Sequence, residues 1–137
     1  MRTAIDTNVF SAIWSAEKSV ALLLVQLEKA RREGALLVSP FVFAELHAYP
    51  GATKGFIGEF LSATGVEVDW KLEQRLWAES AERFAHYATR RRRSSGVEPR
   101  RLLADFLIGA HALVQADRLL TLDPEIYQRD FPELAMF

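Results

Sequence analysis

The sequence has 137 residues, half of them hydrophobic and about a quarter charged, with a net charge of −1. This length is typical of one domain, and the composition excludes a disordered or collagen-like chain. The absence of cysteine excludes disulfides, thiolate nucleophiles and thiolate zinc sites. We therefore predict a single domain over residues 1–137, whose chemistry depends on oxygen and nitrogen ligands.

The sequence contains no signal for a membrane or for export. No uncharged run approaches the ~20 residues that a helix needs to cross a bilayer. The first residues also lack the charged, apolar and cleavage regions of a signal peptide. We therefore expect a cytoplasmic protein that does not associate with a membrane.

Hydrophobic spacing predicts short strands that alternate with helices. Strands are expected over four short apolar segments, residues 2–6, 35–38, 66–68 and 118–121. Helices are expected over the longer segments with helical spacing, residues 8–14, 17–32, 39–48, 56–63, 70–93 and 99–115, with a short turn from 123. Asp69 is expected to cap the long helix after it, and Pro99 to lie in the first turn of the next helix.

This order of elements predicts an α/β fold, a single-domain α/β/α sandwich with a mostly parallel central sheet and right-handed crossovers. Sheets of this kind bind ligands beyond the carboxyl ends of their strands. Asp6 and Asp123 both lie at the carboxyl ends of predicted strands, and Glu45 and Asp105 lie early in helices that can reach the same edge. The four carboxylates are therefore candidates for one site.

Clustered carboxylates repel one another, so a cation is needed to keep them ionised in a partly buried cleft. Oxygen ligands suit Mg²⁺ or Mn²⁺, and such ions can activate water and polarise a phosphodiester. Each acid also has an ordinary interpretation. Asp6 could form an Asx-turn, Asp123 could cap a helix, and Glu45 could be an exposed helix residue. Asp105, which lies among apolar neighbours, is the hardest to explain in this way.

Other chemistry-bearing residues have weaker patterns. The three histidines show no metal-ligand spacing, and we expect them to be surface or hydrogen-bonded core residues: His47, His86 and His111. The three tryptophans are expected in the core rather than as base-stacking platforms: Trp14, Trp70 and Trp77. No glycine-rich phosphate loop or nucleophile elbow is present.

Six arginines surround one predicted loop: Arg90, Arg91, Arg92, Arg93, Arg100 and Arg101. Positive charge at a helix C-terminus complements the helix dipole, so part of this run could be a solvated helix end. Six arginines exceed what a helix end requires, and we therefore predict a contact with the phosphate backbone of a nucleic acid. An acidic segment of a protein partner could use the same patch.

Four segments resemble, in order, the conserved blocks of PIN-domain ribonucleases: IDTNVF, SPFVFAEL, LADFLIGAHAL and LLTLDPEIYQRDFP. The short chain resembles in particular the VapC-type toxins of bacterial toxin–antitoxin pairs. The resemblance implies metal-coordinating acids at Asp6, Glu45, Asp105 and Asp123, with Asn8 and Thr121 as supporting polar groups. It also implies a homodimer and a cognate antitoxin that blocks the cleft. The arginine run matches none of the blocks.

From the residues and the resemblance we expect a Mg²⁺-dependent endoribonuclease, with Mn²⁺ as a possible substitute, in which a metal-bound water attacks phosphorus. The alternative is a catalytically inactive PIN-like module that binds RNA or a protein partner. A phosphoacceptor signalling domain fits less well, because the paired N-terminal acids and late lysine typical of such domains are missing.

Overall fold

The computed structural model describes all residues from 1 to 137 and contains one four-stranded sheet. Its strands are β1 (Thr3–Ile5), β2 (Leu36–Val38), β3 (Val66–Val68) and β4 (Arg118–Leu120). Their order is β3-β2-β1-β4, and all three neighbouring pairs are parallel. Because the chain leaves β1 first toward β2 and later returns to add β4 on the other side, the topological switch point lies between β1 and β4.

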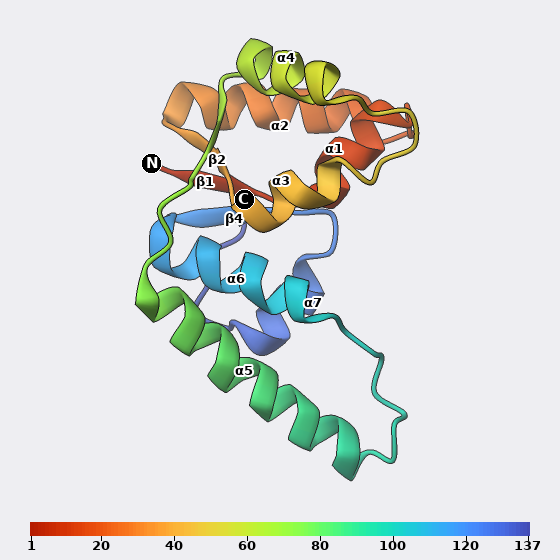
Figure 1. The fold of residues 1–137 in the computed structure, drawn as a ribbon, viewed down its shortest axis with the longest axis vertical. Coiled ribbons are helices and arrows are strands. Elements are labelled where there is room, and N and C mark those ends of the chain that lie inside the picture. The colour runs from red at the N-terminus through yellow and green to blue at the C-terminus, as the bar shows by residue number, and fades with distance from the viewer.

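Seven helices connect and cover the strands. They are α1 (Thr7–Trp14), α2 (Val20–Glu33), α3 (Pro40–Leu46), α4 (Lys54–Thr64), α5 (Gln74–Arg93), α6 (Leu103–Gln115) and α7 (Pro124–Asp130). Figure 1 shows α2 and α4 on one side of the sheet, with α5, α6 and α7 on the other. The predicted single-domain α/β/α sandwich with a parallel sheet is confirmed.

Local sequence explains the helix starts next to the strands. Asp6 precedes α1, and its side chain accepts a hydrogen bond from the Thr7 backbone N–H. Ser39 caps α3 through a bond from the Val42 N–H, and Pro40 occupies the first helical position, as the sequence predicts. Both caps place α1 and α3 directly after a strand, so the start of each helix lies at the carboxyl edge of the sheet.

The core lies on both faces of the sheet and includes the apolar residues of all four strands. On α6, Gly109 contacts Phe131, and an added Cβ atom would lie 2.5 Å from that ring. The small residue therefore makes room for a buried phenylalanine rather than for a ligand beside Asp105. At the sheet edge, the C-terminal segment pairs with β4 through Leu119, which covers the open strand.

Two predicted helix starts are wrong. Helix α5 begins at Gln74 and not after Asp69, because the Asp69 carboxylate accepts hydrogen bonds from His111 and Gln115 instead of capping a helix. Helix α6 begins only at Leu103, and Pro99 lies in the preceding loop. Both differences depend on contacts between distant segments, which local patterns do not reveal.

Two of the three tryptophans are also not core residues. Trp70 and Trp77 are 62% and 49% exposed. Each packs the edge of its ring against a phenylalanine of α3, at ring-centroid distances of 5.0 Å to Phe43 and 5.7 Å to Phe41. Trp14 does pack against the core, as expected. None of the helices combines the length and the hydrophobicity needed to span a bilayer.

Candidate metal and nuclease site

Asp6 lies at the topological switch point, where β1 ends and α1 begins. Its side chain is buried and accepts three hydrogen bonds, from the Thr7 backbone N–H at 2.7 Å, the Thr121 hydroxyl at 2.8 Å and the Tyr127 hydroxyl at 3.0 Å. Burial raises the pKa of the Asp6 carboxyl, the three donors oppose this shift, and the nearby charge of Asp105 adds to it. Asp6 is therefore fixed in position by its donors.

Asn8 and Thr121 connect the ends of β1 and β4. The Asn8 amide donates to the Thr121 hydroxyl oxygen and to Asp123 Oδ2, both at 3.2 Å. The Leu122 backbone N–H donates to the side-chain Oδ1 of Asn8 at 3.2 Å. The Asp123 side chain makes no bond to the start of α7. Asp123 thus occupies the position just before α7, but its side chain contacts Asn8 instead of capping the helix.

Glu45 approaches from α3, and its Oε1 accepts a hydrogen bond from the Thr7 hydroxyl at 3.2 Å. Partial desolvation raises the pKa of Glu45, the bond from Thr7 opposes the rise, and the charges of Asp6 and Asp105 increase it. These electrostatic interactions indicate that the three carboxylates lie near one another. Thr7 thus donates hydrogen bonds to both Asp6 and Glu45.

Asp105 lies in the first turn of α6, where the helix dipole favours negative charge. Its Oδ2 atom accepts a bond from the Leu102 N–H at 3.2 Å and lies 3.7 Å from Arg101 Nε. The side chain is 38% exposed, so the carboxylate is partly accessible to solvent. The contacts with Leu102 and Arg101 therefore orient the Asp105 side chain, which stays partly exposed to solvent.

All four predicted acids line one cavity of about 330 Å³, which we name the acidic cavity. The lining residues are Asp6, Thr7, Asn8, Ser11, Glu45, Asp105, Asp123, Ile126 and Tyr127. No three acidic or histidine side chains of the protein converge closely enough to hold a metal ion between them. The donor set nevertheless suits a hard cation, because Mg²⁺ commonly retains waters and takes only one or two carboxylates directly. The residues present fit such an ion.

Four lining residues were not predicted from the sequence: Thr7, Ser11, Ile126 and Tyr127. Tyr127 is the most informative, because it is buried and its hydroxyl donates to Asp6. Burial and the neighbouring carboxylate charges raise the pKa of Tyr127, so its hydroxyl remains a donor. No local pattern marks Tyr127, because the carboxylate that it contacts lies 121 positions away in the sequence.

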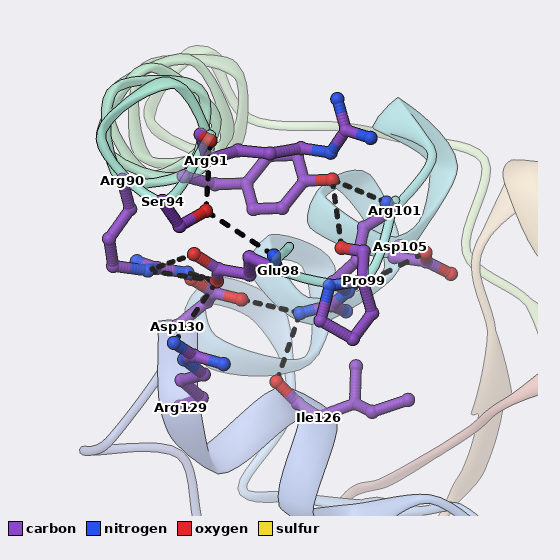
Figure 2. A network of polar contacts seen from close by, with 11 residues as sticks. Arg90, Arg91, Ser94, Glu98, Pro99, Arg101, Asp105, Ile126, Arg129 and Asp130 are labelled. Atoms are coloured by element: carbon purple, nitrogen blue, oxygen red, sulfur yellow. Dashed lines mark hydrogen bonds and ion pairs between the residues drawn. The ribbon is translucent and has the colours of Figure 1, made fainter. Parts of the chain in front are cut away.

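The six arginines divide into two groups. Arg90 and Arg101 form ion pairs with Asp130, whose side chain is only 2% exposed, and Arg90 also pairs with Glu98. Figure 2 shows these side chains converging, together with Arg129, while the Arg91 side chain extends away from the carboxylates. The other four arginines make no ion pair with any carboxylate: Arg91, Arg92, Arg93 and Arg100.

All three histidines follow the prediction, and His47 and His86 are exposed. His111 is a buried core residue, and its Nε2 lies 3.2 Å from Asp69 Oδ2. Burial lowers the pKa of His111, and Asp69 opposes this effect. His47 lies on the surface side of α3, where its Nδ1 is 2.8 Å from the Phe43 carbonyl oxygen. None of the three lines the acidic cavity.

Comparison with known proteins is consistent with this geometry. The sequence profile of the PIN domain matches residues 3–132. The structure is similar to VapBC2 from Rickettsia felis bound to a DNA fragment from their promoter, with a TM-score of 0.73, 20% identity, and coverage of 100% of this chain and 98% of the other. It is also similar to FitAcB from Neisseria gonorrhoeae, with a TM-score of 0.61, 18% identity, and coverage of 98% and 96%. A comparison with curated protein sequences gave no match.

The profile covers nearly the whole chain, and the two solved structures share its fold over nearly their full length. The family resemblance seen in the four sequence blocks is thereby confirmed. The chain belongs to the PIN domain family.

Proposed function

We propose that this protein is a Mg²⁺-dependent endoribonuclease that hydrolyses RNA phosphodiesters. The observation that carries the proposal is the meeting of four acids from distant parts of the chain in one cavity at the switch point of a PIN domain. PIN domains are generally nucleases, and a carboxylate-lined cavity is the kind of site in which a divalent ion supports phosphodiester hydrolysis.

In this proposal Asp6, Glu45 and Asp105 hold the main ion, one or two of them directly and the rest through water, and Asp123 supports it or a second ion through water. A bound Mg²⁺ or Mn²⁺ ion supplies Lewis-acid activation of water and of the phosphodiester. The protein's own contribution is orientation. Thr121 and Tyr127 fix the Asp6 carboxylate, and Asn8 fixes Asp123.

The test is cleavage of a structured RNA in Mg²⁺, in Mn²⁺ and in EDTA. We expect cleavage only with metal, and a loss of at least about 100-fold in Asp6→Asn and Asp105→Asn, because each removes one charged ligand. Glu59→Gln, at an exposed acid of α4 outside the cavity, is the control and should cut normally. Equal cleavage in EDTA, or by both aspartate variants, would rule out the mechanism.

We also propose that the protein is the toxin of a type II toxin–antitoxin system, acts in the cytoplasm and forms a homodimer. Similarity to VapBC2 supports a cognate antitoxin partner, and in this proposal the antitoxin covers the acidic cavity. The proposed dimer face is on α2, where three apolar side chains are 48 to 66% exposed: Leu22, Leu24 and Val25. Exposed apolar residues gathered on one helix favour a protein contact.

The second candidate is an inactive PIN module that binds RNA or a protein without cutting. Two observations favour it: no three acids converge on one point, and Arg101 lies within ion-pair distance of Asp105. RNA binding with a steep salt dependence, together with intact RNA after incubation in Mg²⁺ and Mn²⁺, would establish the module. Metal-dependent cleavage would exclude it.

A further inference from the structure

A second cavity, of about 470 Å³, lies between the end of α5 and the loop that leads to α6. Its lining includes Arg91, Arg92, Arg100 and Arg101 and no acidic residue, so we name it the basic cavity. It is built from three of the four arginines that have no carboxylate partner, and Arg93 is the one that lies outside it. An uncompensated concentration of positive charge in a hollow favours an anion.

The free arginines also retain hydrogen-bonding capacity. The guanidinium of Arg91 donates to no acceptor in the protein, and its Nε atom is buried without a partner. Arg92 donates only to the Thr89 hydroxyl, at 3.3 Å. A phosphate offers several strong acceptors, and guanidinium groups match its geometry. The basic cavity thus presents the donors that a phosphate requires.

Arg101 forms the wall between the basic cavity and the acidic one. It lines the basic cavity, while its Nε lies 3.7 Å from Asp105 and its guanidinium lies 5.6 Å from the centre of the Tyr127 ring. Asp105 and Tyr127 both line the acidic cavity. Arg101 is held in this position by Asp130 and by the Ile126 carbonyl oxygen, as Figure 2 shows. The two cavities therefore adjoin across one fixed side chain.

We propose that the basic cavity binds a backbone phosphate of an unpaired RNA strand, next to the phosphodiester that occupies the acidic cavity. This inference rests on the RNA substrate of the proposed function, but not on cleavage. RNA can cross both cavities, because its phosphates can pair with arginines in one and complete the coordination of a cation in the other. A carboxylate-rich protein segment would be repelled by the acids and confined to the basic cavity.

The test measures binding of a short fluorescein-labelled single-stranded RNA by anisotropy, in EDTA, at salt concentrations from about 50 to 200 mM. The variant Arg92→Gln/Arg100→Gln removes two charges from the basic cavity at exposed side chains that make no ion pair. The control Arg93→Gln/Lys54→Gln removes two exposed charges that line no part of it. Polyglutamate serves as the competitor that represents an acidic protein segment.

We expect the cavity variant to bind at least about tenfold more weakly at 50 mM salt, with a salt slope flatter by about 0.7 to 1.4, corresponding to one or two lost phosphate contacts. The control should bind as the wild type does. An equal loss in both variants would overturn the site in favour of diffuse attraction. Polyglutamate that displaces RNA at matched charge concentration would overturn RNA as the occupant.

Cleavage in Mg²⁺ separates this inference from the proposed function. If the wild-type protein cuts RNA and the cavity variant binds and cuts as well as wild type, the inference is wrong and the function stands. If the cavity variant loses RNA binding as expected but the wild-type protein cuts nothing, the basic cavity stands and the nuclease function is wrong.

Discussion

At the scale of single residues, the charge of the Asp6 carboxylate depends on the hydrogen-bond donors that surround it. A buried carboxylate without donors would become protonated, since burial disfavours its charged form. Three donors offset that cost, and two of them, Thr121 and Tyr127, come from the end of the chain more than 110 positions away. The residues that orient the first acid are therefore supplied by β4 and α7.

Replacing Tyr127 by phenylalanine tests this dependence. Tyr127→Phe removes one hydrogen bond to a charged group, so we expect the free energy of unfolding at neutral pH to fall by about 1.5 kcal/mol and the pKa of Asp6 to rise further. The loss should shrink as the pH falls and Asp6 becomes protonated. Tyr49→Phe, whose hydroxyl contacts only Ser15 near the surface, is the control. Denaturant unfolding at several pH values measures both, and equal losses would contradict the role of Tyr127.

His111 makes the free energy of unfolding depend on pH in a second way. Its pKa in the folded protein is lowered from 6.5 by burial, so the unfolded chain binds the proton more tightly. Stability should therefore be unaffected above about pH 6.5 and fall as the pH decreases below that value, until the folded pKa is reached. His111→Gln should remove this decline, whereas His86→Gln, at an exposed histidine, should retain it. A decline of the same size in His111→Gln would contradict this assignment.

At the scale of elements, Asp130 at the end of α7 connects the loop between α5 and α6 to the rest of the domain. Its buried carboxylate pairs with Arg90 from α5 and Arg101 from the loop before α6. Arginines next to one another in the sequence thus have different environments. Arg90 and Arg101 contribute to the fold, and their neighbours remain available to a partner.

We expect Asp130→Asn to lower the free energy of unfolding by about 3 kcal/mol, because it leaves two arginines facing a group that can no longer balance their charge. The control is Glu133→Gln, which breaks a more exposed ion pair with Arg83 and should cost about 1 kcal/mol or less. Chemical denaturation of both variants provides the measurement. A small loss in Asp130→Asn would show that the network does not hold the loop.

Element order was predictable because it depends on local patterns. The apolar runs at residues 35–38 and 66–68 and the Ser39-Pro40 start are signals within a few positions. The starts of α5 and α6 were not predictable, since Asp69 is drawn to His111 and the loop before α6 is held by Asp130. These two pairings span 42 and 29 positions, and such distant contacts leave no periodic pattern in the sequence. The same reason explains why Tyr127 was missed while the acids were found.

At the scale of the whole molecule, the proposed homodimer depends on the apolar face of α2. Val25→Asp places a charge at the most exposed of its three apolar side chains. We expect this change to shift the protein from dimer to monomer in sedimentation velocity without altering its circular dichroism spectrum, because Val25 makes no contribution to the buried core. Leu103→Asp, at an exposed leucine of α6, is the control. A monomeric wild-type protein would contradict the proposed assembly.

The central claim is that four acids from the first and last thirds of the chain form one metal site. Calorimetric titration with Mn²⁺ tests it most directly, because it requires neither the correct RNA nor an antitoxin. We predict saturable binding to the wild-type protein and to Glu59→Gln, and affinity at least about tenfold weaker in Asp6→Asn and in Asp105→Asn, since each loses a charged ligand. Undiminished Mn²⁺ binding in both aspartate variants would contradict the claim.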